Sequence, residues 1–295
     1  MKKYSLNIAG YIISFESSGS GPDLVPSERF LRNISKNTAS DLLIRVHSDP
    51  FELPKGAEKV FHAPLVEEIN GIMVRNSEKF WSVYKFRSAL YIKTIFPLSK
   101  NGKEGILRFS LTSREWDLYI MKGGKTTDPL EYPLDGLILY YLTVIYGDIM
   151  IHASGVTHSG HGYLFSGISG KGKTTMAKLW DTAGKKVIHD DRLIIRKISG
   201  AYFMHNTPVY NDDEPSASPL NRIYLIDHGK ENKMVPVKGA TAVSLIMANC
   251  IQHSWNKEII AGIMGSLSVL CTHIPVFKLS FRPDRSIIDF ILENE

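Results

Sequence analysis

Short alternating runs of apolar and polar residues dominate the first 130 residues of the chain. The runs are rich in β-branched and aromatic residues and are separated by turn-forming Ser, Gly and Pro, a pattern that predicts short strands. Residues 106–111 alternate cleanly, as is typical of a sheet with one face in water. This part of the chain therefore predicts an antiparallel or mixed sheet. The expected strands cover residues 11–15, 42–46, 72–74, 80–84, 90–92 and 106–111.

The pattern changes between Pro129 and Pro133. Residues 134–146 are apolar nearly all round, which predicts a buried helix that is too short to cross a bilayer. We place a domain boundary in the proline-flanked link before this helix. The sequence thus predicts a β-rich N-terminal domain at residues 1–130, with substrate docking as its candidate role, and a second domain at residues 131–295.

Strands and helices are intermixed in the second domain, which predicts an α/β fold. Short apolar or alternating runs mark the strands, and apolar residues at helical spacing mark the helices. The expected strands cover residues 149–157, 162–166, 186–191, 193–197, 222–227 and 276–281, and the expected helices cover residues 174–183, 241–250, 258–271 and 286–292.

The composition restricts the class of protein and its partners. With 43% hydrophobic and 22% charged residues among 295, the chain is expected to be a soluble globular protein. A net charge of +5 suits an anionic ligand, but Lys and Arg are scattered, so nucleic acid is not an expected partner. Residues 4–9 alternate like a strand rather than a secretion signal, and no apolar run is long enough to span a membrane. We therefore expect a cytoplasmic protein with no membrane partner.

A glycine-rich motif lies between the expected strand 162–166 and the expected helix 174–183. Residues 167–174 read Gly-Ile-Ser-Gly-Lys-Gly-Lys-Thr and match the phosphate-binding loop pattern at every fixed position. Such a loop lets backbone N–H groups wrap a polyphosphate at the positive end of the following helix. Lys173 is expected to reach the β and γ phosphates, and the Thr174 hydroxyl to hold Mg²⁺. The expected nucleotide-binding residues are Gly167, Ser169, Gly170, Lys171, Gly172, Lys173, Thr174 and Thr175.

Two adjacent carboxylates, Asp190 and Asp191, end the expected strand 186–191. A magnesium-nucleotide site requires one carboxylate to bind the metal and one to accept a proton, and a strand end beside a phosphate loop can supply both. Capping of a turn is the alternative role for either residue. His189 is expected to point to the opposite face of the strand and to pack. The acidic residues 212–214 could bind a second metal or a basic substrate, but we expect a solvated loop there.

With these motifs in view, the second domain resembles the HPr kinase/phosphorylase family, bacterial serine kinases whose fold is related to phosphoenolpyruvate carboxykinase. The matching features are His152 in the strand before the loop, the loop at residues 167–173, and the Asp190-Asp191 pair closing the next strand. The C-terminal phrases at residues 218–220, 232–233 and 281–286 are similar to a looser group of HPr-kinase-like proteins. Some members of that group are encoded beside genes for peptide modification, such as those for lasso peptides.

The resemblance implies a kinase domain with a phosphate-binding loop at residues 131–295, preceded by the smaller β-rich domain. It implies Asp190 as the base that accepts the proton of the substrate hydroxyl, and Asp191 with Thr174 as magnesium ligands. It also implies that His152 lies near the γ phosphate or the carboxylates and acts in catalysis together with Lys173.

The expected function is that of a kinase, dependent on ATP and Mg²⁺, that transfers the γ-phosphoryl group to a hydroxyl, a serine of a small protein or peptide. Two alternatives stay open: a small-molecule kinase acting on a free hydroxy amino acid, and a non-catalytic nucleotide-binding regulator. The expected partner is the protein or peptide substrate. The oligomeric state is left open by the sequence, a homo-oligomer included.

Overall fold

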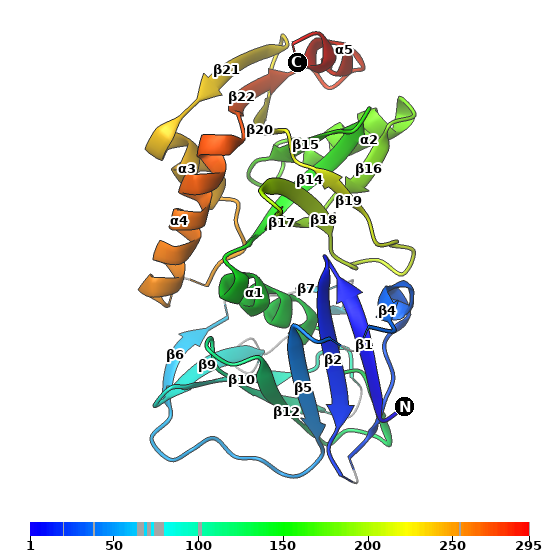
Figure 1. The fold of residues 1–295 in the computed structure, drawn as a ribbon, viewed down its shortest axis with the longest axis vertical. Helices are drawn as coiled ribbons and strands as arrows, with labels where there is room; N and C mark the ends of the chain where they lie inside the picture. Colours follow the sequence, from blue (N-terminus) through cyan, green and yellow to red (C-terminus); the bar gives the residue numbers. More distant parts are fainter. Residues whose placement is uncertain are drawn as a thin grey trace. The chain divides into compact units, whose positions relative to one another are not determined.

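The computed structural model of the chain describes residues 1–19, 21–37, 39–63, 68–69, 72–73, 80–99, 102–253 and 255–294. The chain divides into two compact units, Met1–Ile145 and Tyr146–Glu295. Each unit is built around its own large sheet (Figure 1). Among the helices of the described residues, none is long and apolar enough to cross a membrane.

The sheet of the first unit is mixed, as the sequence predicts. Strand β5 runs parallel to both β2 and β12, whereas the other strand pairs of this sheet are antiparallel. The strand order is β4-β1-β2-β5-β12-β11-β10-β9-β6. Its strands are β1 (Lys3–Ile8), β2 (Tyr11–Ser17), β4 (Ile34–Ser35), β5 (Leu42–His47), β6 (Glu58–His62), β9 (Trp81–Phe86), β10 (Ala89–Ile95), β11 (Glu104–Phe109) and β12 (Glu115–Met121).

Short elements accompany this sheet. Strands β3 (Asp23–Leu24) and β13 (Thr126–Thr127) pair in parallel, and β7 (Glu68–Ile69) pairs with β8 (Ile72–Met73) in antiparallel fashion. A 3-10 helix covers Glu28–Asn33. Of the strand expected at residues 72–74, residue 74 lies outside the described residues.

Helix α1 (Leu134–Tyr146) belongs with the first unit rather than the second. Its Tyr141 ring lies 4.6 Å from the Phe109 ring of β11, and its Asp135 pairs with Arg29 at 2.9 Å. The helix is apolar on nearly every side, and such a helix is stable only when other elements cover it. The boundary between the units therefore lies at the C-terminal end of this helix, between Ile145 and Tyr146, whereas the proline pattern placed it before the helix.

The second unit is an α/β unit in which each expected strand and helix has a counterpart, together with three strands that were not expected, at residues 201–206, 217–219 and 233–237. Its sheet has the order β19-β18-β17-β14-β15-β20-β22-β21, and β16 also pairs with β14. The strands are β14 (Ile149–His158), β15 (His161–Ser166), β16 (Lys186–His189), β17 (Arg192–Ile198), β18 (Ala201–Asn206), β19 (Ala217–Pro219), β20 (Arg222–His228), β21 (Lys233–Val237) and β22 (Val276–Phe281). The helices are α2 (Lys173–Thr182), α3 (Gly239–Met247), α4 (Lys257–His273) and α5 (Ser286–Glu293).

A hydrophobic core fixes α2, the helix that follows the glycine-rich loop. Met176 and Trp180 of α2 are fully buried and lie four residues apart, on one face of the helix. The Trp180 ring lies 5.2 Å from the ring of Tyr163 and 6.1 Å from that of Phe165, both in β15. Burial of large aromatic side chains contributes about 1.5–3 kcal/mol each. The strand before the loop and the helix after it are thus locked together.

Strand register brings two distant segments to the same level of the sheet. On one side of β14, Ala153 pairs with Ser166, the last residue of β15. On the other side, β16 and β17 pair one after the other with β14, and this pairing is interrupted at residues 190–191. Gly155 lies opposite His189, and His152 lies opposite Arg192. The interruption therefore lies one strand away from the start of the glycine-rich loop.

Candidate functional site

The glycine-rich loop begins after β15 and ends at Gly172, the N-cap residue of α2. Gly172 has a φ of +96°, and a Cβ atom there would lie 2.7 Å from Cζ of Phe281. Only glycine fits this position, because it combines a left-handed backbone with a close neighbour. Gly172 provides no side-chain cap, so the first-turn amides of α2 have no acceptor from the N-cap side chain. Such a helix end attracts anions.

Lys173 directs its ammonium group back into the loop. Its Nζ donates to the carbonyl oxygen of Gly167 at 2.7 Å and to that of Ile168 at 3.3 Å. Burial lowers the pKa of Lys173, and the nearby carboxylates of Asp190 and Asp191 act in the opposite direction. Lys173 is thus a buried cation, 7% exposed, that is bonded to the loop and influenced by the charges of the carboxylate pair.

The other loop residues face solvent to differing degrees. Ser169, Gly170 and Thr174 are exposed, and Thr175 is half-buried. The Lys171 side chain turns outward, where its Nζ lies 2.9 Å from Oδ1 of Asp227. The two loop lysines therefore differ in environment, although they are only two positions apart: Lys171 pairs at the surface, and Lys173 is buried.

Asp190 is held by a residue that the sequence did not single out. The Ser154 hydroxyl of β14 is fully buried and donates to Oδ1 of Asp190 at 2.7 Å. The backbone beside it is fixed by the Ala153 amide, which donates to the carbonyl oxygen of Asp191 at 3.1 Å. Among the described residues, Ser154 is the hydrogen-bond donor to the Asp190 side chain, and none of them donates to Oδ2 of that carboxylate.

His152 lies beside Asp191, with 3.4 Å between Nε2 and Oδ1. Partial burial lowers the pKa of His152, and the charges of Lys173 and Arg192 lower it further, against the opposing effect of the two aspartates. The neutral imidazole is therefore favoured near neutral pH. The Arg192 guanidinium lies 3.7 Å from the other oxygen of Asp191, between Nε and Oδ2. Asp191 thus has basic groups on both of its oxygens.

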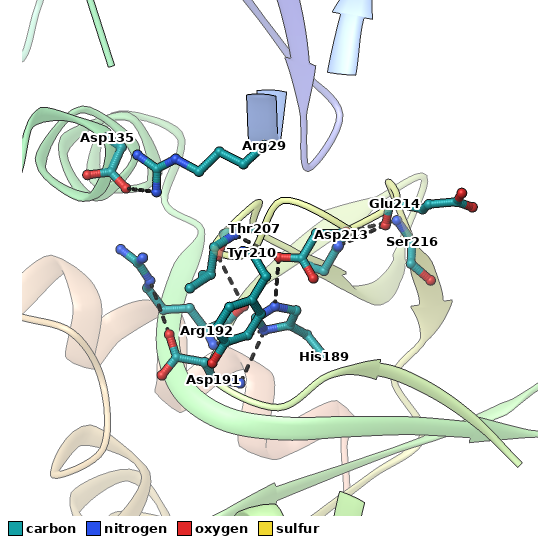
Figure 2. Close-up of polar contacts among 12 residues, drawn as sticks. Arg29, Asp135, His189, Asp191, Arg192, Thr207, Tyr210, Asp213, Glu214 and Ser216 are labelled. Carbon is teal, nitrogen blue, oxygen red and sulfur yellow. Dashed lines mark hydrogen bonds and ion pairs between the residues drawn. The ribbon is translucent and has the colours of Figure 1, made fainter. Parts of the chain in front are cut away.

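His189 is a buried polar residue of the site, which corrects the expectation that it only packs. Its Nδ1 lies 3.1 Å from the amide of Asp191 and 3.3 Å from that of Arg192, and both amides donate to it. Its Nε2 lies 3.2 Å from Oδ2 of Asp213 (Figure 2). The regular alternation of strand side chains did not apply, because β16 ends at His189 and pairing is interrupted at the next two residues.

Asp213 is half-buried, which corrects the expectation of a solvated loop for this residue, whereas Asp212 and Glu214 are exposed as expected. Its Oδ2 accepts hydrogen bonds from the amides of Val209 and Tyr210, each at 2.7 Å. The Tyr210 ring stacks on that of His189, with 5.8 Å between centroids (Figure 2). Burial raises the pKa of Tyr210, and so do the charges of Asp191, Asp190 and Asp213. The local sequence gives no signal for this contact, because an Asx turn bonds amides that follow the aspartate, whereas these two amides precede Asp213.

The described residues contain no group of three His, Cys, Asp or Glu side chains that could hold a metal ion by themselves. Mg²⁺ in nucleotide sites needs fewer protein ligands, because one or two carboxylates are joined by phosphate oxygens and water. Asp191 is half-buried at the interruption, and the Thr174 hydroxyl is exposed at the start of α2. The oxygen donors, together with the uncapped helix end, fit a magnesium-nucleotide pair.

Comparisons with known proteins add a distant structural likeness. No protein-family model matches this sequence, and a search of curated proteins found no match. Among solved structures, the HPr(Ser) kinase/phosphatase from Coxiella burnetii aligns with 49% of this chain and 94% of its own, at 10% sequence identity and a TM-score of 0.30. A likeness at this TM-score does not define a shared site, and the chemistry follows from the residues of this chain.

Proposed function

We propose that this protein is a kinase that transfers the γ-phosphoryl group of ATP to a hydroxyl group, a serine of a small protein or peptide. One observation carries the proposal: the loop that holds the buried Lys173 and the segment that holds the hydrogen-bonded Asp190 lie on the two sides of β14, at the same level of the sheet. Lys173 is held by loop carbonyls, and Asp190 is held by Ser154. Burial lowers the pKa of Lys173, and the charges of Asp190 and Asp191 raise it in part. Phosphoryl transfer needs a cation for the phosphates and a base for the acceptor in this proximity.

Each side chain has one task in this proposal. The amides of the first turn of α2 and the ammonium of Lys173 bind phosphate oxygens. Ser154 occupies Oδ1 of Asp190, so Oδ2 is directed to accept the proton of the acceptor hydroxyl. His152 is neutral and next to Asp191, which it orients without adding charge.

Asp191 and Thr174 are the proposed ligands of Mg²⁺. Bound there, the ion neutralises phosphate charge that develops during transfer. The protein contributes mainly position and fixed charge, which are the main sources of catalysis in phosphoryl transfer.

The decisive experiment replaces the proposed base. Asp190→Asn keeps the size of the side chain and is expected to abolish transfer while nucleotide affinity stays close to that of the wild type. Transfer is measured with γ-labelled ATP against serine-containing peptides and against free hydroxy amino acids, and affinity with a fluorescent ATP analogue. Asp181→Asn, at an exposed position of α2, is the matched control and retains activity.

Three outcomes would overturn parts of the proposal. Equal transfer by Asp190→Asn and the wild type removes Asp190 from its role as the base. A wild type that binds ATP but phosphorylates neither acceptor class is a nucleotide-binding regulator rather than a kinase. Transfer to free hydroxy amino acids alone would identify a small-molecule kinase.

A further inference from the structure

His189 joins two parts of the second unit that are separate in sequence. Its Nδ1 receives the amides of Asp191 and Arg192, and its Nε2 faces Asp213, 24 residues away. Thr207 reinforces the junction, since its fully buried hydroxyl donates to the carbonyl oxygen of Arg192 at 3.3 Å. The segment 207–213 is therefore attached to residues 189–192 at two points (Figure 2).

The contacts of the ring define its tautomer. Two N–H groups point at Nδ1, so this nitrogen is an acceptor and carries no proton. Nε2 then carries the proton and donates it to Oδ2 of Asp213 at 3.2 Å. The His189 side chain is 4% exposed, and the ring of Tyr210 covers it. Both nitrogens are thus satisfied by groups that are themselves fixed.

We propose that His189 is a positioning residue of this site, which holds the backbone of the Asp190-Asp191 segment for Mg²⁺-nucleotide and ties that segment, through Asp213, to the turn at residues 209–213. The role in metal binding rests on the proposed function, whereas the positioning of the backbone does not. His189 touches neither the reacting atoms nor the phosphates in this proposal. It acts through the two amides that it accepts. Carboxylates that bind or activate are effective only when their backbone is fixed within a fraction of an ångström.

Two substitutions separate the functions of the two ring nitrogens. In His189→Asn, the side-chain oxygen can take the place of Nδ1 and accept the two amides, but the link to Asp213 is lost. In His189→Gln, the longer amide can still donate to Asp213, but no acceptor remains at the position of Nδ1. A merely structural role for the ring would make the two variants alike, or would make the better-filled Gln variant the milder one.

The first measurement is hydrogen exchange of the Asp191 and Arg192 amides in the full chain. We expect protection close to the wild type in His189→Asn and clear loss of protection in His189→Gln. The second measurement is the Mg²⁺ concentration that half-saturates the magnesium-dependent binding of fluorescent ATP analogue. Groups that orient metal ligands typically affect affinity by about 10- to 100-fold, so we expect a shift of that size in His189→Gln and a smaller one in His189→Asn.

The proposal is overturned if His189→Gln keeps both the protection of the two amides and the magnesium dependence of the wild type. If either variant fails to fold, nitrogen-15 NMR of the wild-type ring still decides, because a proton on Nδ1 contradicts the proposal. A wild type that binds no ATP analogue would refute the proposed function. In that case amide exchange alone tests the positioning role of His189. Failure of the proposed function can thus be distinguished from failure of the positioning role.

Discussion

The hydroxyl of Ser154 in β14 donates a hydrogen bond of 2.7 Å to Oδ1 of Asp190, which lies between the neighbouring strands β16 and β17. The two residues are 36 positions apart in sequence, and Ser154 has no solvent exposure. A hydrogen bond to a charged group is worth about 1.5–3 kcal/mol. Because Ser154 occupies Oδ1, Oδ2 is the oxygen of Asp190 that remains available to the hydroxyl group of the substrate.

We expect Ser154→Ala to slow ATP turnover by about 10- to 100-fold, because Asp190 loses the donor that orients it. Ser166→Ala is the matched control, since Ser166 is equally buried but its hydroxyl has no partner among the described residues. Steady-state turnover with saturating ATP measures the effect, and thermal unfolding shows whether both variants fold. Similar turnover in the two variants would contradict the orienting role.

Lys173→Met is expected to weaken ATP binding by about 10- to 100-fold, since a charge-assisted contact to phosphate is lost. Lys171→Met should have a much smaller effect, because the Lys171 side chain pairs with Asp227 at the surface. Titration of a fluorescent ATP analogue compares the two variants. Equal losses would mean that the loop binds phosphate through general positive charge rather than through Lys173.

Gly172→Ala is expected to destabilise the second unit by roughly 2–5 kcal/mol, because a left-handed backbone and a contact of 2.7 Å with Phe281 act together. Gly170→Ala also meets a positive φ, of +81°, but its Cβ has no neighbour within 4 Å, so about 1–2 kcal/mol is expected. Denaturant unfolding measures both free energies. A larger loss in Gly170→Ala would show that close packing at Gly172 is not the constraint.

Stability of the second unit is expected to fall on acidification, in part through His253. Burial lowers the pKa of His253 from 6.5 to about 4. Between these two pH values the unfolded chain binds a proton that the folded chain does not, so the free energy of unfolding decreases as the pH falls. The shift corresponds to a loss of up to roughly 3 kcal/mol.

His253→Gln should therefore reduce the slope of stability against pH between about pH 6.5 and pH 4, and leave the slope above pH 7 unchanged. His161→Gln, at the exposed first residue of β15, is the control. Chemical denaturation at a series of pH values measures the slopes. A slope that His253→Gln does not change would remove His253 as a source of the acid sensitivity.

Contiguous patterns in the sequence determined much of the second unit. The loop at residues 167–174 is a local motif, and the helix after it is specified by the spacing of Met176 and Trp180, both of which are buried in the structure. Strand alternation likewise predicted the mixed sheet of the first unit. These predictions succeed because backbone turns and side-chain periodicity depend on neighbours in sequence.

Only the tertiary structure decided which distant side chains meet. Ser154 reaches Asp190, and His189 reaches Asp213, through strand register and a turn that hydrophobic periodicity does not specify. The assignment of α1 to the first unit was also decided by packing, since a helix that is apolar on every side does not indicate which sheet will cover it. The sequence thus supplied the loop and the carboxylates, and the fold supplied the partners that orient them.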